Sequence, residues 1–241
     1  GLKADQINPE KNIISQQMMD QNRKALKDSK QNTSITTSPS GVTSIKKLSG
    51  RQSASQGNIT SIMVYIRFLG EPEFLTASLF NADKEMMNGA WPSLNSYVAA
   101  QSEGACTLTS VFPQQNETSL ASYEDIYTRD YYQPFSSSNL VGYSSESERG
   151  YREQKLVARA IDSLANDPDI PSAAEIDKNG DSYIDNVNFM VSGSSDSWSD
   201  LLWPHRWSYY LRAPRPAING KYLHSYTFQL SDMYTENRPG A

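Results

Sequence analysis

Apolar and polar residues follow each other with a changing period along the chain, and that period predicts its strands and helices. Residues 62–69 form a mainly apolar run of β-forming residues bounded by Gly and Pro, which predicts a buried central strand. Residues 107–112 alternate and stop at a proline, and residues 186–191 are again mostly apolar. Both segments predict strands.

Helical spacing occurs between these strands. Residues 76–100 predict two helices, one starting at Thr76 or Ser78 and the other at Ser93. Leu94, Tyr97 and Val98 are expected to pack inward. A sharp turn is predicted later in the chain, at Asn219-Gly220.

The clearest helix is predicted for residues 148–166, before Pro168. Its apolar residues recur with helical spacing and predict one buried face, while its charged residues are expected mostly outside. The apolar set is Leu156, Val157, Ala160, Ile161 and Leu164, and the charged set is Arg149, Arg152, Glu153, Lys155 and Arg159.

Residues 1–58 differ from the rest in charge and composition. They hold nine Lys and Arg against four Asp and Glu, a net charge of +5, while the remainder of the chain carries −10. Residues 13–27 predict one amphipathic helix, and Ser, Thr, Gln, Asn and Gly dominate after it. We therefore expect a pro-segment or flexible linker at 1–58 and a main domain at 59–241.

Composition excludes several classes of function. The chain of 241 residues has one cysteine, Cys106, so it has neither an internal disulfide nor a cysteine-based zinc site. No apolar run approaches the roughly 20 residues of a membrane helix, so no membrane span is expected. The acidic main domain argues against nucleic acid as a partner. Gly1 followed by polar residues is typical of a mature or trimmed start.

Residues 177–185, Asp-Lys-Asn-Gly-Asp-Ser-Tyr-Ile-Asp, place oxygen-bearing side chains at alternate positions. Calcium binds six to eight oxygens, and such spacing in a tight loop brings them to one point. The predicted calcium ligands are Asp177, Asn179, Asp181, the backbone carbonyl of Tyr183, and Asp185.

The loop departs from a complete helix–loop–helix calcium site. Ser182 stands at the sixth position, where glycine is usual, and Asn188 stands at the twelfth in place of glutamate. The segment that follows is strand-like, so we expect a structural calcium site between a helix and a strand. A turn rich in Asp, Asn and Gly that binds no metal is the alternative.

Segments of the chain, in order, resemble the immune inhibitor A family of secreted bacterial zinc metallopeptidases. The resemblance covers about residues 60–241 and lies in residues 63–68, 91–97 with 107–112, 151–164, 177–185, 187–192 and Trp203-Pro204-His205-Arg206-Trp207. It implies a zincin-like mixed α/β fold, a twisted mixed sheet packed with helices and incomplete at its C-terminal end. It also implies a secreted or cell-surface bacterial protein acting on extracellular proteins or peptides.

Zinc is implied by this resemblance only. The family's His-Glu-x-x-His helix binds zinc with two histidines and activates water with the glutamate. This chain has only His205 and His224, and the motif is absent, so residues 1–241 are expected to be inactive as a peptidase. His205 is interpreted either as a substrate-side or zinc-supporting residue or as a buried structural histidine. The competing functional hypothesis is a non-catalytic calcium-binding domain for binding or adhesion, derived from a peptidase.

Overall fold

The computed structural model describes residues 57–113, 115–116, 119–194, 203–211 and 215–232, with two short strands at 36–37 and 43–44. The chain divides into two compact units, residues 1–52 and 53–241. In the first unit, β1 (Thr36–Thr37) pairs antiparallel with β2 (Thr43–Ser44). The helix predicted for residues 13–27 lies outside the described residues.

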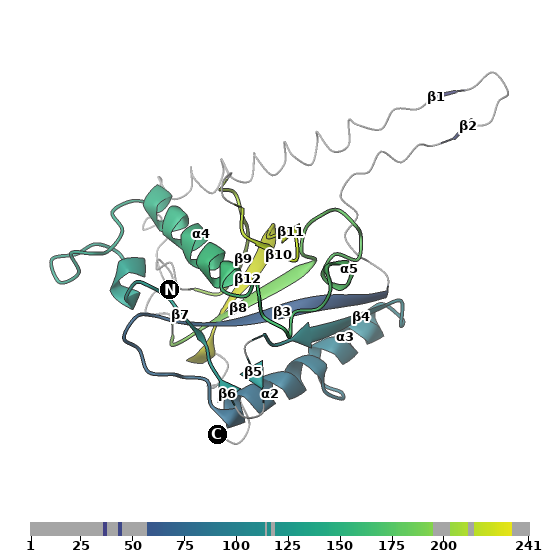
Figure 1. Cartoon of the computed structure of the whole chain (residues 1–241), viewed down its shortest axis with the longest axis horizontal. Coiled ribbons are helices and arrows are strands. Elements are labelled where there is room, and N and C mark those ends of the chain that lie inside the picture. The colour runs from purple at the N-terminus through teal and green to yellow at the C-terminus, as the bar shows by residue number, and fades with distance from the viewer. Residues whose placement is uncertain are drawn as a thin grey trace, which may run out of the picture. The chain divides into compact units, whose positions relative to one another are not determined.

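The second unit is built on a mixed sheet with the strand order β4-β3-β8-β12-β9 (Figure 1). Neighbouring strands in this order are parallel, except β9, which runs antiparallel to β12 at the edge. The short strand β7 pairs with the end of β3. The bounds are β3 (Gly57–Arg67), β4 (Cys106–Val111), β7 (Tyr123–Glu124), β8 (Asn186–Val191), β9 (His205–Ser208) and β12 (Ser225–Leu230).

The central strand β3 is apolar on both faces because both faces are covered. Ile62, Val64 and Ile66 belong to the main core, whereas Tyr65 belongs to a smaller core on the opposite face with Phe80. Parallel strands covered on both sides read as continuous apolar runs, which is the pattern of this segment. The predicted strands at 62–69, 107–112 and 186–191 are confirmed, with β3 starting five residues earlier.

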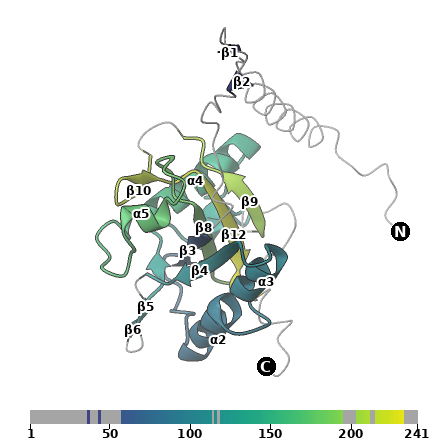
Figure 2. The ribbon, with the colours of Figure 1, turned by 90° about the vertical axis from the view of Figure 1, so that its right-hand side faces the viewer.

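Helices lie on both faces of the sheet. Figure 1 shows α4 on one side and α2 with α3 on the other, and Figure 2 shows the same separation. The side chain of Thr76 caps α2 (Ala77–Asn88), and that of Ser93 caps α3 (Leu94–Gln101), so both predicted helix starts are confirmed. The mixed α/β class is confirmed with them.

The inward packing predicted for α3 is wrong in part. Leu94 and Tyr97 are exposed, and no residue of this helix is fully buried. The side chain of Asn95 accepts a hydrogen bond from the backbone N–H of Leu108 at 3.2 Å, which attaches the helix to β4.

The helix α4 (Glu146–Asp162) buries the apolar face that its spacing predicts, from Leu156 to Ile161, and Leu164, just after its end, is buried too. Two residues expected outside, Arg152 and Glu153, are buried as well. Arg152 pairs with Glu148 and donates to the backbone carbonyl of Val141, and Glu153 accepts from buried partners described below. Charged side chains are buried here because each is paired.

The connection between β4 and α4 is long and irregular. It contains β5 (Gln115–Asn116), β6 (Ser119–Leu120), the short strand β7 and the 3₁₀ helix η2 (Arg129–Tyr132). The turn at Asn219-Gly220 is confirmed and joins β10 (Ala217–Ile218) to β11 (Lys221–Tyr222). No helix among the described residues has the length and apolar character to cross a membrane.

Candidate functional site

The acidic loop lies between the short helix α5 (Ala173–Ile176) and the sheet strand β8. Gly180 and Ser182 both have φ near +71°, the left-handed region that favours glycine. Ser182 thus adopts the backbone conformation for which glycine is usual, at a cost of about 1 kcal/mol. The loop keeps its turn despite the missing sixth-position glycine.

The predicted ligands at the start of the loop fold back onto its backbone. Asp177 accepts hydrogen bonds from the N–H of Asp181 at 3.0 Å and of Ser182 at 3.0 Å. Asn179 accepts from the same Asp181 N–H at 2.9 Å. The structure therefore brings Asp177, Asn179 and Asp181 together around one turn.

The end of the loop is hydrogen-bonded to its beginning and to the end of α5. The side chain of Asp185 accepts from the N–H of Lys178 at 2.8 Å, and its own N–H donates to the carbonyl of Ile176 at 2.8 Å. Asp181 accepts from the N–H of Tyr183 at 2.9 Å. Asp185 thus closes the loop against its own beginning.

Tyr183, expected to contribute its carbonyl, also anchors the loop through its side chain. Its ring packs edge-on against His224 with centroids 5.2 Å apart, and Arg215 donates to its hydroxyl at 3.1 Å. On either side of it, Ile184 donates to the carbonyl of Tyr222, and Tyr222 donates to that of Ser182, each at 3.0 Å. The β10–β11 hairpin is therefore hydrogen-bonded to the loop.

The carboxylates of the loop lie close enough to influence each other. Burial raises the pKa of Asp185, and the negative charges of Asp177 and Asp181 raise it further. Burial acts on Asp177 in the same direction, but the hydrogen bond from Lys221 and those from the loop amides outweigh it and lower its pKa. The loop is a concentration of negative charge on which two positive side chains act, Lys178 within it and Lys221 from the β10–β11 hairpin.

The donor set of the loop consists of oxygen atoms, which is the chemistry that calcium prefers. In the arrangement described, however, no three His, Cys, Asp or Glu side chains are grouped to hold a metal ion, counted over the described residues. The backbone amides and Lys221 hold the carboxylates instead. For zinc the fit is poor, because Cys106 is buried in β4 and the two histidines belong to different surroundings.

His205 lies at the start of β9, with both ring nitrogens hydrogen-bonded. Nε2 is 2.9 Å from Glu153 Oε1, and Nδ1 is 2.7 Å from the carbonyl of Trp203. Tyr226 also donates to Glu153. Sequence reasoning missed Glu153 and Tyr226, which lie 52 residues before and 21 residues after His205 in the chain. This arrangement has the character of a buried structural histidine.

A second polar cluster that the sequence did not indicate lies beyond the ends of β3 and β8. Arg129 donates to Glu71 at 2.7 Å and to the carbonyl of Ser192 at 2.8 Å, and Ser192 donates to Glu71 at 2.6 Å. Each of these polar groups has a partner. The cluster therefore joins two parallel strands to the η2 segment.

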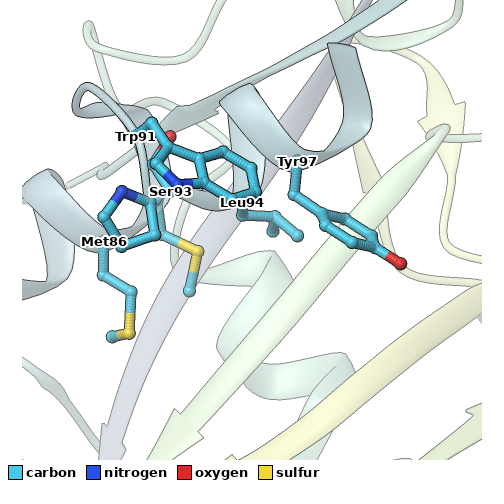
Figure 3. Close-up of a pocket in the computed structure, with 7 residues that line it drawn as sticks. Met86, Trp91, Ser93, Leu94 and Tyr97 are labelled. Atoms are coloured by element: carbon cyan, nitrogen blue, oxygen red, sulfur yellow. The ribbon is translucent and has the colours of Figure 1, made fainter. Parts of the chain in front are cut away.

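The surface also carries an apolar hollow of about 330 Å³ beside α3 (Figure 3). Trp91, 68% exposed, and Tyr97, 53% exposed, line it with Met86 and Leu94. No carboxylate, histidine or cysteine is among its lining residues. The hollow offers apolar contact but not the groups that acid–base or metal chemistry requires.

Comparison with known proteins adds no family. No protein-family model matches the chain, and no curated protein matches it.

Proposed function

We propose that this chain is the calcium-stabilised part of a secreted or cell-surface bacterial protein of the zinc metallopeptidase type, whose zinc ligands lie outside residues 1–241. The observation that carries this proposal is the loop at residues 177–185. Its carboxylates are gathered between a helix and a sheet strand, where Asp177 and Asp181 raise the pKa of Asp185. Charges brought together in this way favour a hard cation.

Calcium at this position would be structural. Asp177, Asn179, Asp181, Asp185 and the carbonyl of Tyr183 would hold it, and it would supply the positive charge that offsets the carboxylates. Because the loop directly precedes β8 and is hydrogen-bonded to the β10–β11 hairpin, fixing it would fix two parts of the domain. No chemical step is assigned to these residues.

The sheet supports a protein or peptide as the partner. The edge strand β9 pairs with β12 on one side, and within the described part of the chain it has no second strand partner. Extended peptides bind by adding a strand to such an edge, with backbone hydrogen bonds giving affinity. The mixed sheet with helices on both faces is also what the metallopeptidase resemblance implies, so it supports a zincin-like architecture.

A second candidate function is a non-catalytic binding or adhesion domain. The observation that favours it is a surface hollow of about 440 Å³ lined by exposed apolar side chains, among them Leu69, Ile126 and Val141. Exposed apolar groups of this kind mark surfaces for protein interaction when they are contiguous. Calcium at the loop is common to both candidates.

The coding sequence that follows Ala241 separates the two candidates. A His-Glu-x-x-His motif within about twenty codons would support the peptidase, and the full product should then cleave a protein substrate in a chelator-sensitive manner. A stop codon directly after Ala241 would contradict the peptidase and support the binding domain.

Calcium binding is tested by calorimetry on residues 1–241. Binding heat is expected for the wild type and for Asp169→Ala, which removes an exposed aspartate outside the loop. Asp181→Ala should lose it, because the loop loses one of its carboxylate ligands. Equal binding by the two variants would contradict the assignment of the site.

A further inference from the structure

The outer edge of β4 carries backbone groups that could pair with a further strand. In the part of the chain that the structure describes, β4 is the last strand of the sheet on this side, and it pairs parallel with β3. On that side the N–H of Gly57 donates to the carbonyl of Ala105 at 2.8 Å. Bonding residues alternate along a strand, so Cys106, Leu108 and Ser110 direct their backbone groups away from β3.

Side-chain amides from two helices bind this outward row. Asn88, the last residue of α2, accepts from the N–H of Ser110 at 2.8 Å and donates to its carbonyl at 2.7 Å. Asn95, in the first turn of α3, accepts from the N–H of Leu108 at 3.2 Å. The amide of Asn88 therefore takes the place that the backbone of a neighbouring strand would occupy at Ser110.

A hydroxyl binds the start of the same edge. Ser102, which follows α3 directly, accepts from the N–H of Cys106 at 2.9 Å, and its Oγ also lies 2.9 Å from the carbonyl of Cys106. Figure 2 shows α3 beside β4. Unpaired backbone groups at a sheet edge are a template for pairing with another chain, and proteins cover or block such edges. Here polar side chains block it.

We propose that Asn88, Asn95 and Ser102 form a cap that closes the β4 edge to a second copy of this chain. The outward groups recur at every second residue and are centred on Leu108. Two antiparallel copies of β4 would therefore pair with themselves about a two-fold axis, Leu108 opposite Leu108 and Cys106 opposite Ser110. The uncapped edge would be self-complementary, and the cap keeps the sheet from extending in this direction.

Hydrogen exchange followed by NMR measures the cap in the wild type. The amides of Cys106, Leu108 and Ser110 are expected to exchange slowly, within about tenfold of those of Thr107 and Thr109, which face β3. Exchange of the three outward amides at the rate of an unstructured chain would overturn the cap. This measurement needs no variant and is informative even where a substitution prevents folding.

Two alanine variants test what the cap does, each at low protein concentration first. Asn88→Ala should speed the exchange of the Ser110 amide about fivefold or more, and Asn95→Ala should do the same for Leu108, because each amide loses its acceptor. Asn81→Ala is the matched control, since Asn81 lies on α2 with an exposed side chain. It should leave both rates unchanged.

Sedimentation velocity of the double variant Asn88→Ala/Asn95→Ala tests the role of the cap against a second copy. Its dimer fraction should exceed that of the wild type and of Asn81→Ala and rise with concentration over about 1–100 μM, a range in which a weak dimer forms. The Leu108 and Ser110 amides of the double variant should regain slow exchange as the dimer forms. The same sedimentation as the wild type would overturn the proposal, and so would association that leaves these two amides in fast exchange.

Discussion

His205 and Glu153 form a buried pair that joins the edge strand β9 to α4: Nε2 of the imidazole lies 2.9 Å from Oε1 of the carboxylate, and each side chain is 8% exposed. The other ring nitrogen faces a backbone carbonyl, which only accepts hydrogen bonds. When it is protonated, the imidazole donates from both nitrogens and carries a positive charge. Burial lowers the pKa of His205, but the hydrogen bond and the charge of Glu153 outweigh it and raise the pKa.

This pair predicts a definite pH dependence of stability. Because the folded-state pKa of His205 lies above its unfolded value of about 6.5, the pair's contribution is fully present below about pH 6.5 and falls as pH rises through the folded-state pKa. Glu153→Gln should lower the free energy of unfolding by about 1–3 kcal/mol at about pH 6 and by less at about pH 9.

Urea denaturation of the wild type and Glu153→Gln at several pH values measures this difference. Glu146→Gln is the control, because Glu146 pairs with Arg149 on the helix surface and its side chain is 43% exposed. Its effect should be small and constant over this range. A Glu153→Gln effect that does not change with pH would contradict the charged pair.

The ion pair between Arg159 on α4 and the buried Asp125 is expected to contribute strongly to the stability of the domain. Arg159 donates to Asp125 at 2.8 and 3.0 Å, and the side chain of Asp125 is fully buried. Arg159→Met leaves that carboxylate without its cation and should cost about 3 kcal/mol. Arg149→Met breaks the surface pair with Glu146 on the same helix and should cost less than about 1 kcal/mol. Chemical denaturation followed by circular dichroism compares the two, and similar losses would contradict this interpretation.

Leu156 on α4 and Tyr97 on α3 are expected to differ strongly in what their replacement by alanine costs in stability. Leu156 is completely buried against the sheet, so Leu156→Ala should destabilise the domain by about 2–5 kcal/mol. Tyr97, 53% exposed beside the hollow of α3, should tolerate alanine within about 0.5 kcal/mol. Thermal denaturation of both variants measures this. A large loss with Tyr97→Ala would show that α3 packs inward after all.

The parts of the fold that the sequence predicts correctly are those with a strong local pattern. The apolar run of β3, the helical spacing from Leu156 to Leu164 and the Asn219-Gly220 turn all act within a few residues. The predicted inward packing of Leu94 and Tyr97 was wrong: both are exposed, although Asn95 attaches α3 to β4 by a hydrogen bond with Leu108. Periodicity alone does not distinguish a buried apolar contact from a polar one.

In the candidate site, too, the sequence indicates residues that are close along the chain but not contacts between distant segments. The proposed calcium ligands lie within nine residues, so their spacing alone suggests them. Lys221, 44 residues after Asp177, and Glu153, 52 residues before His205, are brought to their partners only by the sheet and its hairpin. Isolated charged residues on a helix or in a hairpin are usually solvated, and nothing in their local sequence separates these two from that majority.

Calcium is proposed to stabilise this domain through the loop at residues 177–185, and the melting temperature of the chain with calcium and with a chelator tests this most directly. Calcium at about 100 times its dissociation constant should stabilise the domain by about 2.7 kcal/mol. For a domain of this size, that corresponds to a rise of about 5–10 °C. The rise should be absent in Asp181→Ala. Equal melting temperatures of the wild type in calcium and in chelator would contradict the claim.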